Sequence, residues 1–406
     1  MNYTDNPDSV PATSMDKINI VITGRRNTGK SSLTNSLLGQ EKAIVSDIAG
    51  TTTDPVKKSY EIPGFASVIF TDTAGIDDEG ALGQQRIEKS LQAIRLSDAA
   101  ILTFTGNDFG TEEEKLTEEL KQYEIPFLIV HNKSDLSPLA SGLRQELEHR
   151  YKVQVIDFSA HHSDPQILID ALKTIVRPPE HRSLIGPLVR RGDIVMLVTP
   201  IDSEAPAGRI ILPQVQMIRD VLDNKCISIV LQPEEITDFL ERTQITPSLV
   251  ITDSQVFGKV AQLIPYSIPL TSFSIVLAHH KGNFGHYLSG TAQIDRLRDG
   301  DRILMLESCS HHVSCEDIGR VKIPALLRKH TGKQLEFDFI AGLDQIKRPV
   351  TDYALAIQCG GCMITARQLR NRLLPVINAG IPVSNYGMTI AWIQGIFQRT
   401  TSPFRK

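Results

Sequence analysis

The sequence has no apolar run long enough to span a bilayer, no clustered basic tract and few cysteines. Its 406 residues carry 43 Lys and Arg against 47 Asp and Glu, a formal net charge of −4 at pH 7. We therefore expect neither a membrane nor a nucleic acid as a partner. Five cysteines, an odd number, form no disulfide framework. They indicate a protein of the reducing cytoplasm and, if anything, a metal site.

The chain is too long for one ordinary core, so several domains are expected. Residues 1–16 are polar and lack both the basic and the apolar region of a secretory signal, which predicts a disordered lead-in. Prolines near residues 178 and 265 predict domain boundaries. The expected domains are residues 17–178, 186–265 and 266–406.

The first domain alternates strand-like and helix-like patterns, which is typical of a doubly wound α/β sheet that binds nucleotide at the carboxyl ends of its strands. The expected strands are Ile18–Thr23, Tyr60–Ile62, Ser67–Asp72, Ala99–Thr105, Phe127–Asn132 and Val153–Phe158. The expected helices are Ser31–Leu38, Gly83–Leu96, Glu112–Tyr123, Ser141–Tyr151 and Ile167–Val176.

A glycine-bounded loop, Gly24–Ser31, connects the first strand to the first helix with the pattern G-x-x-x-x-G-K-S. Glycines let backbone N–H groups close around phosphate oxygens, and the helix N-terminus adds partial positive charge. Lys30 can reach the β- and γ-phosphates, and Ser31 can offer its hydroxyl to Mg²⁺. The nucleotide-binding residues expected in this P-loop are Asn27, Thr28, Gly29, Lys30, Ser31 and Ser32.

Three later segments, each after a strand, narrow the nucleotide to GTP. Asp72–Gly75 would place a carboxylate near Mg²⁺ and a backbone N–H near the γ-phosphate. In Asn132–Asp135, the last carboxylate can accept both N–H donors of guanine, a pair that adenine lacks. The third segment, Ser159-Ala160, would close over the base. Each short motif alone is weak, but four in this order are specific. The residues expected to bind the nucleotide here are Asp72, Gly75, Asn132, Lys133, Asp135, Ser159 and Ala160.

On these motifs, Gly24–Ala160 resembles GTPases of the translation-factor-related class and is most similar to the bacterial tRNA-modification type. The resemblance implies that Thr52 approaches Mg²⁺ when GTP is bound, with Thr51 beside it. It also implies that Asn27 helps to hold K⁺ beside the phosphates, so K⁺ should speed hydrolysis. The catalytic residues would be Lys30, Thr52 and Gly75.

Ile76 occupies the position where some GTPases carry a water-orienting glutamine, and isoleucine cannot orient water. We therefore expect slow intrinsic hydrolysis. The second switch segment, Ile76–Gln85, holds Gly80, Gly83 and an acidic run. We expect it to reorganise on turnover, because its composition gives it few reasons to be rigid.

Residues 186–265 predict a small α/β domain. Its expected strands are Ile194–Thr199, Ile227–Leu231 and Leu249–Thr252, and its expected helices are Gln214–Leu222, Pro233–Arg242 and Ser254–Leu263. The domain has no catalytic constellation, so we expect an association surface that forms a homodimer. Cys226 opens a strand and is expected to be a small buried residue.

Residues 266–406 predict a third α/β domain, in which two cysteine groups follow strands. Cys309-Ser310-His311-His312 follows the expected strand Arg302–Glu307, and Cys359-Gly360-Gly361-Cys362 follows the expected strand Tyr353–Gln358. Such strand ends can be neighbours in one sheet, and the glycines let both thiolates turn toward one point. The expected metal ligands are Cys309, Cys359 and Cys362 with His311 or His312; Cys315 is a less favoured thiolate. This set fits zinc or an iron–sulfur cluster, and spacing does not separate them.

The order of these parts resembles the maturation GTPases of [FeFe]-hydrogenase over nearly the whole chain. The resemblance rests on the run DTAGIDDEGALG at Asp72–Gly83, on Cys309-x-His311 and on Cys359–Cys362. It implies that the three cysteines hold a [4Fe–4S] cluster in a C-terminal iron–sulfur domain. It also implies a scaffold that carries the two-iron precursor of the hydrogenase active site, is loaded by radical-enzyme maturases and delivers to the immature hydrogenase.

The sequence departs from that family at Gln358, where members often have histidine. Glutamine is a poor iron ligand, which leaves the fourth coordination position to His311, His312 or an exchangeable ligand. The alternative function is a zinc-stabilised GTPase switch associated with RNA or the ribosome, which the net charge disfavours. The identity of the metal distinguishes the two.

Overall fold

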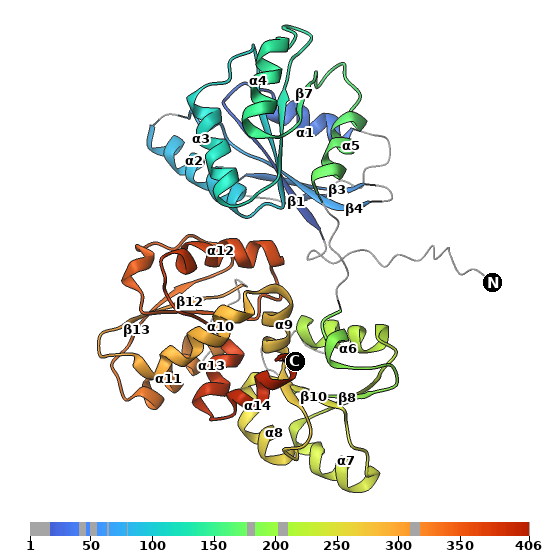
Figure 1. Cartoon of the computed structure of the whole chain (residues 1–406), viewed down its shortest axis with the longest axis vertical. Coiled ribbons are helices and arrows are strands. Elements are labelled where there is room, and N and C mark those ends of the chain that lie inside the picture. Colours follow the sequence, from blue (N-terminus) through green and yellow to red (C-terminus); the bar gives the residue numbers. More distant parts are fainter. Residues whose placement is uncertain are drawn as a thin grey trace, which may run out of the picture. The chain divides into compact units, whose positions relative to one another are not determined.

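The computed structural model describes residues 17–39, 46–48, 55–62, 65–78, 80–176, 183–201, 210–308 and 317–405. The expected lead-in, residues 1–16, lies outside them. Contacts within the chain define two compact units, Met1–Glu180 and His181–Lys406 (Figure 1). No helix in the described ranges is both long and apolar enough to cross a membrane.

The first unit is built on a seven-stranded sheet of order β2-β3-β4-β1-β5-β6-β7. β3 pairs antiparallel with β2 and β4, and the remaining neighbours are parallel. The strands are β1 (Ile18–Gly24), β2 (Ser46–Ile48), β3 (Val56–Ile62), β4 (Ala66–Asp72), β5 (Ala99–Phe104), β6 (Phe127–His131) and β7 (Val155–Asp157). The helices are α1 (Lys30–Leu38), α2 (Gly80–Arg95), α3 (Thr111–Gln122), α4 (Ser141–Tyr151) and α5 (Gln166–Ile175).

Helices cover both faces of this sheet. Leu33 of α1 and Leu172 of α5 are fully buried in one core with Ile20 of β1, while α2 and α3 lie on the other side of the sheet (Figure 1). Every residue of β5 and β6 is buried, as expected of parallel strands covered on both faces. β1 lies between β4 and β5, so the strand order reverses beside the P-loop, where doubly wound sheets bind ligands.

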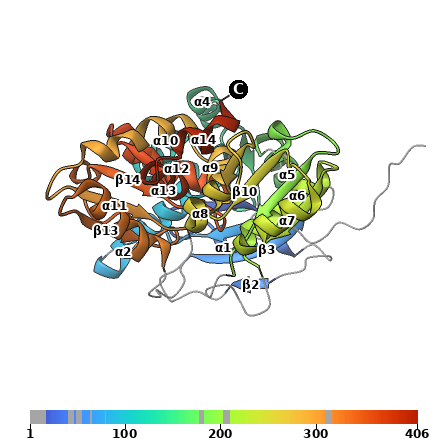
Figure 2. The ribbon, with the colours of Figure 1, turned by 90° about the horizontal axis from the view of Figure 1, so that it is seen from below.

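The second unit holds two four-stranded parallel sheets, of order β11-β10-β8-β9 and β13-β12-β14-β15. Their strands are β8 (Ile194–Val198), β9 (Ile227–Leu231), β10 (Leu249–Thr252), β11 (Leu270–Ser272), β12 (Arg302–Leu306), β13 (Glu336–Ile340), β14 (Leu355–Gln358) and β15 (Val383–Asn385). The helices are α6 (Leu212–Asp223), α7 (Ile236–Thr243), α8 (Phe257–Leu263), α9 (Phe273–Lys281), α10 (Phe284–Thr291), α11 (Ile323–Thr331), α12 (Ala366–Asn378), α13 (Tyr386–Ile393) and α14 (Phe397–Thr401). Figure 2 shows α10, α11 and α13 gathered beside β13 and β14.

The fourth strand of the first of these sheets, β11, lies beyond Pro265, where the sequence predicts a domain boundary. The end of the chain also returns to that region. The Arg399 guanidinium of α14 donates to the carbonyls of Ala261, Ile264 and Pro265 at 2.8–3.0 Å. Residues on both sides of the expected boundary therefore pack together in one unit.

Candidate functional site

The conformation of the P-loop depends on a glycine and on contacts of its own lysine. Gly29 adopts φ 82°, and a Cβ at this position would collide with the side-chain amide of Asn132. The Lys30 side chain is buried and donates to the carbonyls of Gly24 at 3.2 Å and Arg25 at 2.7 Å. Burial lowers the pKa of Lys30, against the opposing effect of nearby carboxylates. The loop thus holds a fixed amino group at the N-terminus of α1.

The Asp72 carboxylate lies at the carboxyl end of β4 and has one buried oxygen, Oδ1, without a hydrogen-bond partner in the described ranges. Burial raises the pKa of Asp72, whereas a hydrogen bond from Ser31 and the charge of Lys30 lower it. An unpaired carboxylate oxygen beside a hydroxyl suits Mg²⁺, which prefers oxygen ligands. The structure therefore fits the expected Mg²⁺ ligands Ser31 and Asp72.

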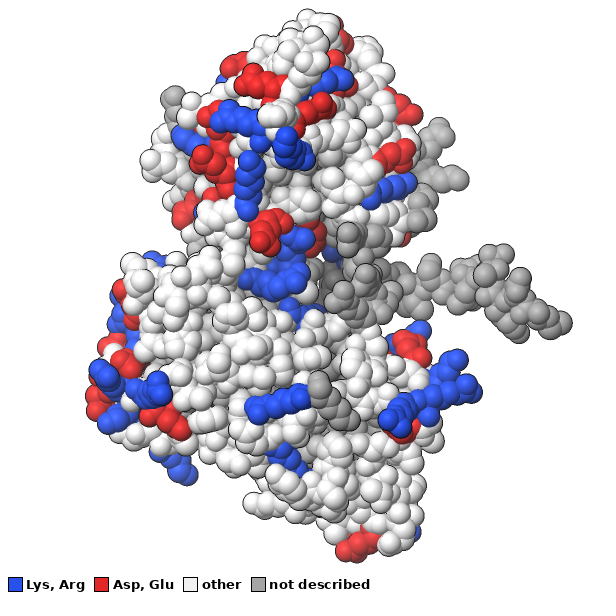
Figure 3. All heavy atoms as spheres, in the orientation of Figure 1, with Lys and Arg blue, Asp and Glu red and all other residues white. Residues whose placement is uncertain are grey.

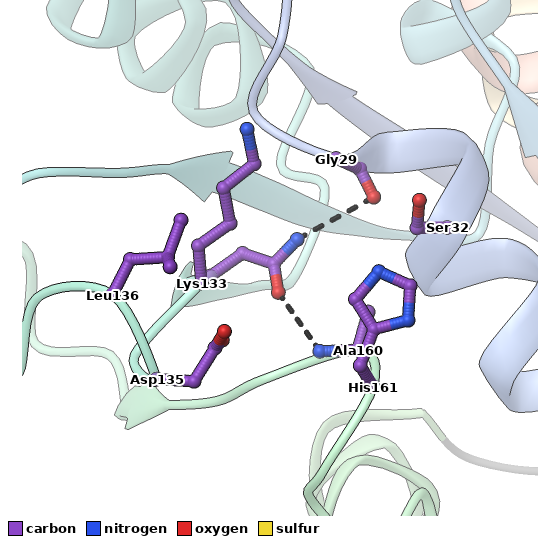
Figure 4. Close-up of a pocket in the computed structure, with 8 residues that line it drawn as sticks. Gly29, Ser32, Lys133, Asp135, Leu136, Ala160 and His161 are labelled. Atoms are coloured by element: carbon purple, nitrogen blue, oxygen red, sulfur yellow. Dashed lines mark hydrogen bonds between the residues drawn. The ribbon is translucent and has the colours of Figure 1, made fainter.

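A pocket of about 130 Å³ lies beside the start of α1 (Figure 4). The Asn132 side chain bridges its walls, because Nδ2 donates to the Thr28 carbonyl at 2.9 Å and Oδ1 accepts from the Ala160 N–H at 3.2 Å. Asp135 is exposed, and the Ser159 side chain holds its pKa below the usual range. The pocket therefore joins three of the four nucleotide motifs. Its lining residues are Gly29, Ser32, Asn132, Lys133, Asp135, Leu136, Ala160 and His161.

The second switch segment contacts the P-loop in a way that the sequence did not predict. Asp77 Oδ1 accepts a hydrogen bond from the Arg26 N–H at 2.6 Å, and Arg26 Nε lies 3.2 Å from Asp78 Oδ1. From Gly80 onward the segment is helical, three residues before the expected start of the helix. Gly75 packs so closely on Arg26 that a Cβ would collide with its backbone. The P-loop and the residues that follow Asp72 are therefore in direct contact through a hydrogen bond, an ion pair and close packing.

The cysteine loop, Cys359–Cys362, leaves the carboxyl end of β14 beside the end of β12. The parallel register pairs Leu306 with Gln358, so the residues that follow both strands meet at one sheet edge. The Ser308 N–H donates to Cys359 Sγ at 3.1 Å, and the next residue in the sequence is Cys309. Neither described cysteine of the loop forms a disulfide.

Burial, with a further contribution from Cys359, raises the pKa of Cys362 to about 11. This thiol therefore stays neutral until a metal displaces its proton.

Two cations lie near the cysteine loop. Lys281 donates to the Gly361 carbonyl at 2.9 Å. The buried Arg372 donates to the carbonyls that follow β12 and end β13. These positive groups would offset the charge of metal-bound thiolates.

Several expected site residues lie outside the described ranges: Thr51, Thr52, Cys309, His311, His312 and Cys315. Within those ranges, no three Cys, His, Asp or Glu side chains meet where a metal ion could bind. The donors that are described, two thiols on a glycine-containing turn, fit a thiophilic centre such as zinc or an iron–sulfur cluster.

Sequence reasoning missed four residues that the structure brings to these sites. Arg26, Lys281 and Arg372 act through contacts with segments distant in sequence, for which spacing gives no signal. Ser308 is adjacent to Cys309 in the sequence, and that adjacency was the one signal available.

The sequence matches three family models. The hydrogen maturase F tetramerization domain covers residues 285–403, and the hydrogen maturase F dimerization domain covers residues 184–282. The 50S ribosome-binding GTPase family covers residues 19–133.

Individual relatives match about a third of the chain. The tRNA modification GTPase MnmE of Endomicrobium trichonymphae is 40% identical over 146 residues, which cover 34% of this chain and 31% of the relative. GTPase Der of Wolinella succinogenes is 37% identical over 141 residues, which cover 34% of this chain and 30% of the relative. The chain thus spans about a third of each curated relative.

Solved GTPase structures are also similar. Era of Aquifex aeolicus, bound to GDP and AlF4−, matches with a TM-score of 0.35 and 19% identity, over 63% of this chain and 100% of that one. The G domain of the FeoB iron transporter of T. maritima matches with a TM-score of 0.32 and 18% identity, over 39% of this chain and 98% of that one.

Proposed function

Because the chain belongs to the hydrogen maturase F family, we propose that it is a GTP-hydrolysing scaffold for building the active site of [FeFe]-hydrogenase. It binds a [4Fe–4S] cluster, carries the two-iron precursor of that active site and delivers it to the immature hydrogenase. The observation that carries this proposal is that one chain holds a pocket lined by the expected guanine-binding residues, a paired-cysteine loop and the two family-specific domains.

In the GTPase reaction, this chain supplies positioning and charge. Lys30 contacts the β- and γ-phosphates, the Gly75 N–H contacts the γ-phosphate, and Asp135 accepts the two N–H donors of guanine. Ser31 and Asp72, together with Thr52, would hold Mg²⁺, which would supply positive charge beside the phosphates. Hydrolysis is slow because Ile76 supplies no group that orients the attacking water.

GTP acts through the second switch segment. The Arg26 N–H that a phosphate would approach is occupied by the Asp77 carboxylate at 2.6 Å, and Asp78 pairs with the Arg26 guanidinium. An arriving γ-phosphate repels both carboxylates and competes for the same donors. The segment before α2 therefore changes its contacts with the nucleotide state, which suits control of loading or of partner exchange.

In the second unit, Cys309, Cys359 and Cys362 are the proposed thiolate ligands of the cluster. When bound, the cluster would supply an iron position for a second iron unit, and His311, His312 or an exchangeable ligand would be the fourth ligand. Lys281 and Arg372 stabilise the anionic thiolates. The proposed domain limits are 17–178, 186–265 and 266–406, with β11 packed against the middle one.

The dimerization and tetramerization domains support self-association. Among the described strands, β9 is the edge of its sheet, and Ile227 and Val230 on it are 53% and 43% exposed. Leu222, at the end of the neighbouring helix α6, is 57% exposed. An apolar edge strand is a template for pairing, so we propose that a second copy of the chain covers it.

The name of the matched GTPase family favours one alternative, a zinc-stabilised switch that acts on RNA or the ribosome. Such binding depends on clustered positive charge that releases counterions. On the face shown in Figure 3, acidic and basic side chains are interspersed over the first unit without a broad basic patch. The net charge of −4 also disfavours binding to RNA or the ribosome.

A delivery assay tests the proposed function. The protein is produced anaerobically together with the radical-enzyme maturases, purified and mixed with immature hydrogenase, and hydrogen evolution is measured. We expect activation by the unsubstituted protein and none by a Cys359→Ser/Cys362→Ser variant. Equal activation by both would contradict the carrier function.

A further inference from the structure

The glutamine that precedes the cysteine loop is fully buried beside the cysteine sulfur. Gln358 is 0% exposed, and its Nε2 lies 3.1 Å from Ser308 Oγ and 3.5 Å from Cys359 Sγ. Its Oε1 is buried and has no hydrogen-bond partner in the described ranges. Burying an amide with an unpaired oxygen costs free energy. Core packing alone therefore does not explain why a polar side chain lies here.

Ser308 connects the amide to the sulfur. Its side chain is almost completely buried, its N–H donates to Cys359 Sγ at 3.1 Å, and its Oγ lies 2.9 Å from the same sulfur. With Cys359 as a thiol, the S–H donates to Ser308 Oγ, which also accepts a hydrogen bond from the Gln358 amide. Asn385 of β15 donates to the Gln358 carbonyl at 3.2 Å, so the backbone before Cys359 is fixed as well.

Metal binding reverses one of these hydrogen bonds. A metal-bound cysteine is a thiolate and has no proton to donate. The close contact between Ser308 Oγ and Cys359 Sγ is then favourable only if the hydroxyl donates to the sulfur. Because Gln358 Nε2 still donates to the hydroxyl oxygen, the hydroxyl proton is directed away from the amide and toward the thiolate. Cys359 Sγ then accepts from both the N–H and the O–H of Ser308.

We propose that Gln358 is a positioning residue and not an iron ligand: it orients the Ser308 hydroxyl as a donor to the Cys359 thiolate and so raises the reduction potential of the cluster. Reduction adds negative charge that is shared with the ligand sulfurs. Hydrogen bonds to sulfur therefore stabilise the reduced state more than the oxidised state. This inference rests on the proposed function, because it assumes a cluster on Cys359.

The test is a double-mutant cycle with the midpoint potential of the [4Fe–4S] protein as its readout. Gln358→Met keeps the length of the side chain and removes the amide, and Ser308→Ala removes the hydroxyl. We expect each substitution to disfavour the reduced state by roughly tenfold, a shift of about 59 mV to more negative potential for one electron. Gln358 acts through Ser308 and also has its own longer contact with Cys359 Sγ at 3.5 Å. The double variant should therefore shift by less than the sum of the two single shifts.

Two further variants separate this role from general damage to the fold. Ser384→Ala is the matched control, since Ser384 is fully buried on the neighbouring strand β15 and bonds to Thr291 and Thr389 at 2.8 Å; its potential should not move. Ser308→Thr keeps the hydroxyl and should retain the original potential. Unshifted potentials at full iron content, or additive shifts in the double variant, overturn the inference.

Failure of the proposed function gives a different result, namely unsubstituted protein that takes up no cluster after anaerobic reconstitution. In that event the hydrogen bonds are tested with Co²⁺ bound to the cysteines. Loss of a donor to the thiolate should move the sulfur-to-cobalt charge-transfer band to longer wavelength in Ser308→Ala and Gln358→Met, but not in Ser384→Ala. A band that stays in place overturns the inference without reference to iron.

Discussion

The P-loop and the cysteine loop both leave the carboxyl end of a parallel strand, but they prepare for their ligands in opposite ways. The P-loop presents backbone N–H groups and the buried amino group of Lys30, which donates to the carbonyls of Gly24 and Arg25. Asn27 and Gly29, both in the left-handed region, shape the loop. The cysteine loop presents thiols, and the pKa of Cys362 is raised to about 11. The Lys30 amino group brings positive charge to its site, whereas Cys362 becomes charged when a metal displaces its proton.

The two sites use different groups, so each can be lost while the other remains. A substitution in the P-loop should stop hydrolysis and leave the metal in place, and a substitution in the cysteine loop should do the reverse.

The largest effect is expected for Lys30→Ala. Removing the cation that faces the phosphates should lower kcat/KM for GTP by on the order of 1,000-fold, because charge stabilisation dominates phosphoryl transfer. Phosphate release measures the rate, and iron analysis of the same preparation should show an unchanged content. Lys115→Ala, which removes an exposed lysine paired with Glu112, is the control. Equal loss of iron and of hydrolysis in Lys30→Ala would contradict the independence of the two sites.

The next effect is a change of base preference in Asp135→Asn. An amide offers one acceptor and one donor where guanine needs two acceptors, which costs about 1.5–3 kcal/mol, or roughly 10- to 150-fold in Kd for GTP. Xanthosine triphosphate, which replaces the amino donor of guanine by an oxygen, should bind this variant more tightly than GTP does. Titrations with fluorescent nucleotides measure both affinities. Asp164 is an exposed carboxylate just before α5, and Asp164→Asn should leave both affinities unchanged. An unaltered preference for GTP in Asp135→Asn would contradict the base assignment.

A smaller effect is expected from the monovalent cation. With Asn27 as a K⁺ ligand, hydrolysis should be about tenfold faster in K⁺ than in Na⁺, equivalent to about 1.4 kcal/mol of barrier. Asn27 has φ 60°, so Asn27→Gly removes the side-chain oxygen without straining the backbone and should abolish the difference. Lys152→Gly, at an exposed residue with φ 57°, is the matched control. Equal rates in the two salts for the unsubstituted protein remove the K⁺ assignment.

The smallest effect concerns self-association. Val230→Lys places a charge on the apolar edge strand β9 and should weaken self-association by about 1–2 kcal/mol, or roughly 5- to 30-fold in Kd. Sedimentation velocity across a concentration series measures it. Val56→Lys changes an exposed strand valine of the first unit and should leave the association constant unaltered. If both variants associate like the unsubstituted protein, a surface other than β9 joins the copies.

The two loops also differ in how far the sequence predicts them. Gly24, Lys30 and Asp72 belong to motifs whose positions follow from the strands that precede them, and the structure has those strands with small changes at their ends. The contact of Asp77 with Arg26 could not be predicted, because it depends on how a glycine-rich segment folds back on the P-loop.

In the second unit, the local sequence pattern predicts the helices and strands less well. Ile275, Val276, Leu277 and Ala278 of α9 are all buried, so the helix has no polar face and no helical period to detect. β11 and β15 have three residues each, too few to show alternation. In the sequence, Gln358 stands out only as a departure from a family pattern. Its burial beside Ser308 and Cys359 depends on the pairing of β12 with β14.

The central claim, that the cysteine loop binds a cluster while the first unit binds GTP, is tested most directly by metal analysis and electron paramagnetic resonance of anaerobically purified protein. A variant with Cys309, Cys359 and Cys362 all changed to serine is measured beside it. The account predicts about four irons per chain and a reducible cubane signal, both lost in the variant, with GTP hydrolysis retained. Stoichiometric zinc, with no cluster signal after reconstitution with iron and sulfide, would contradict it.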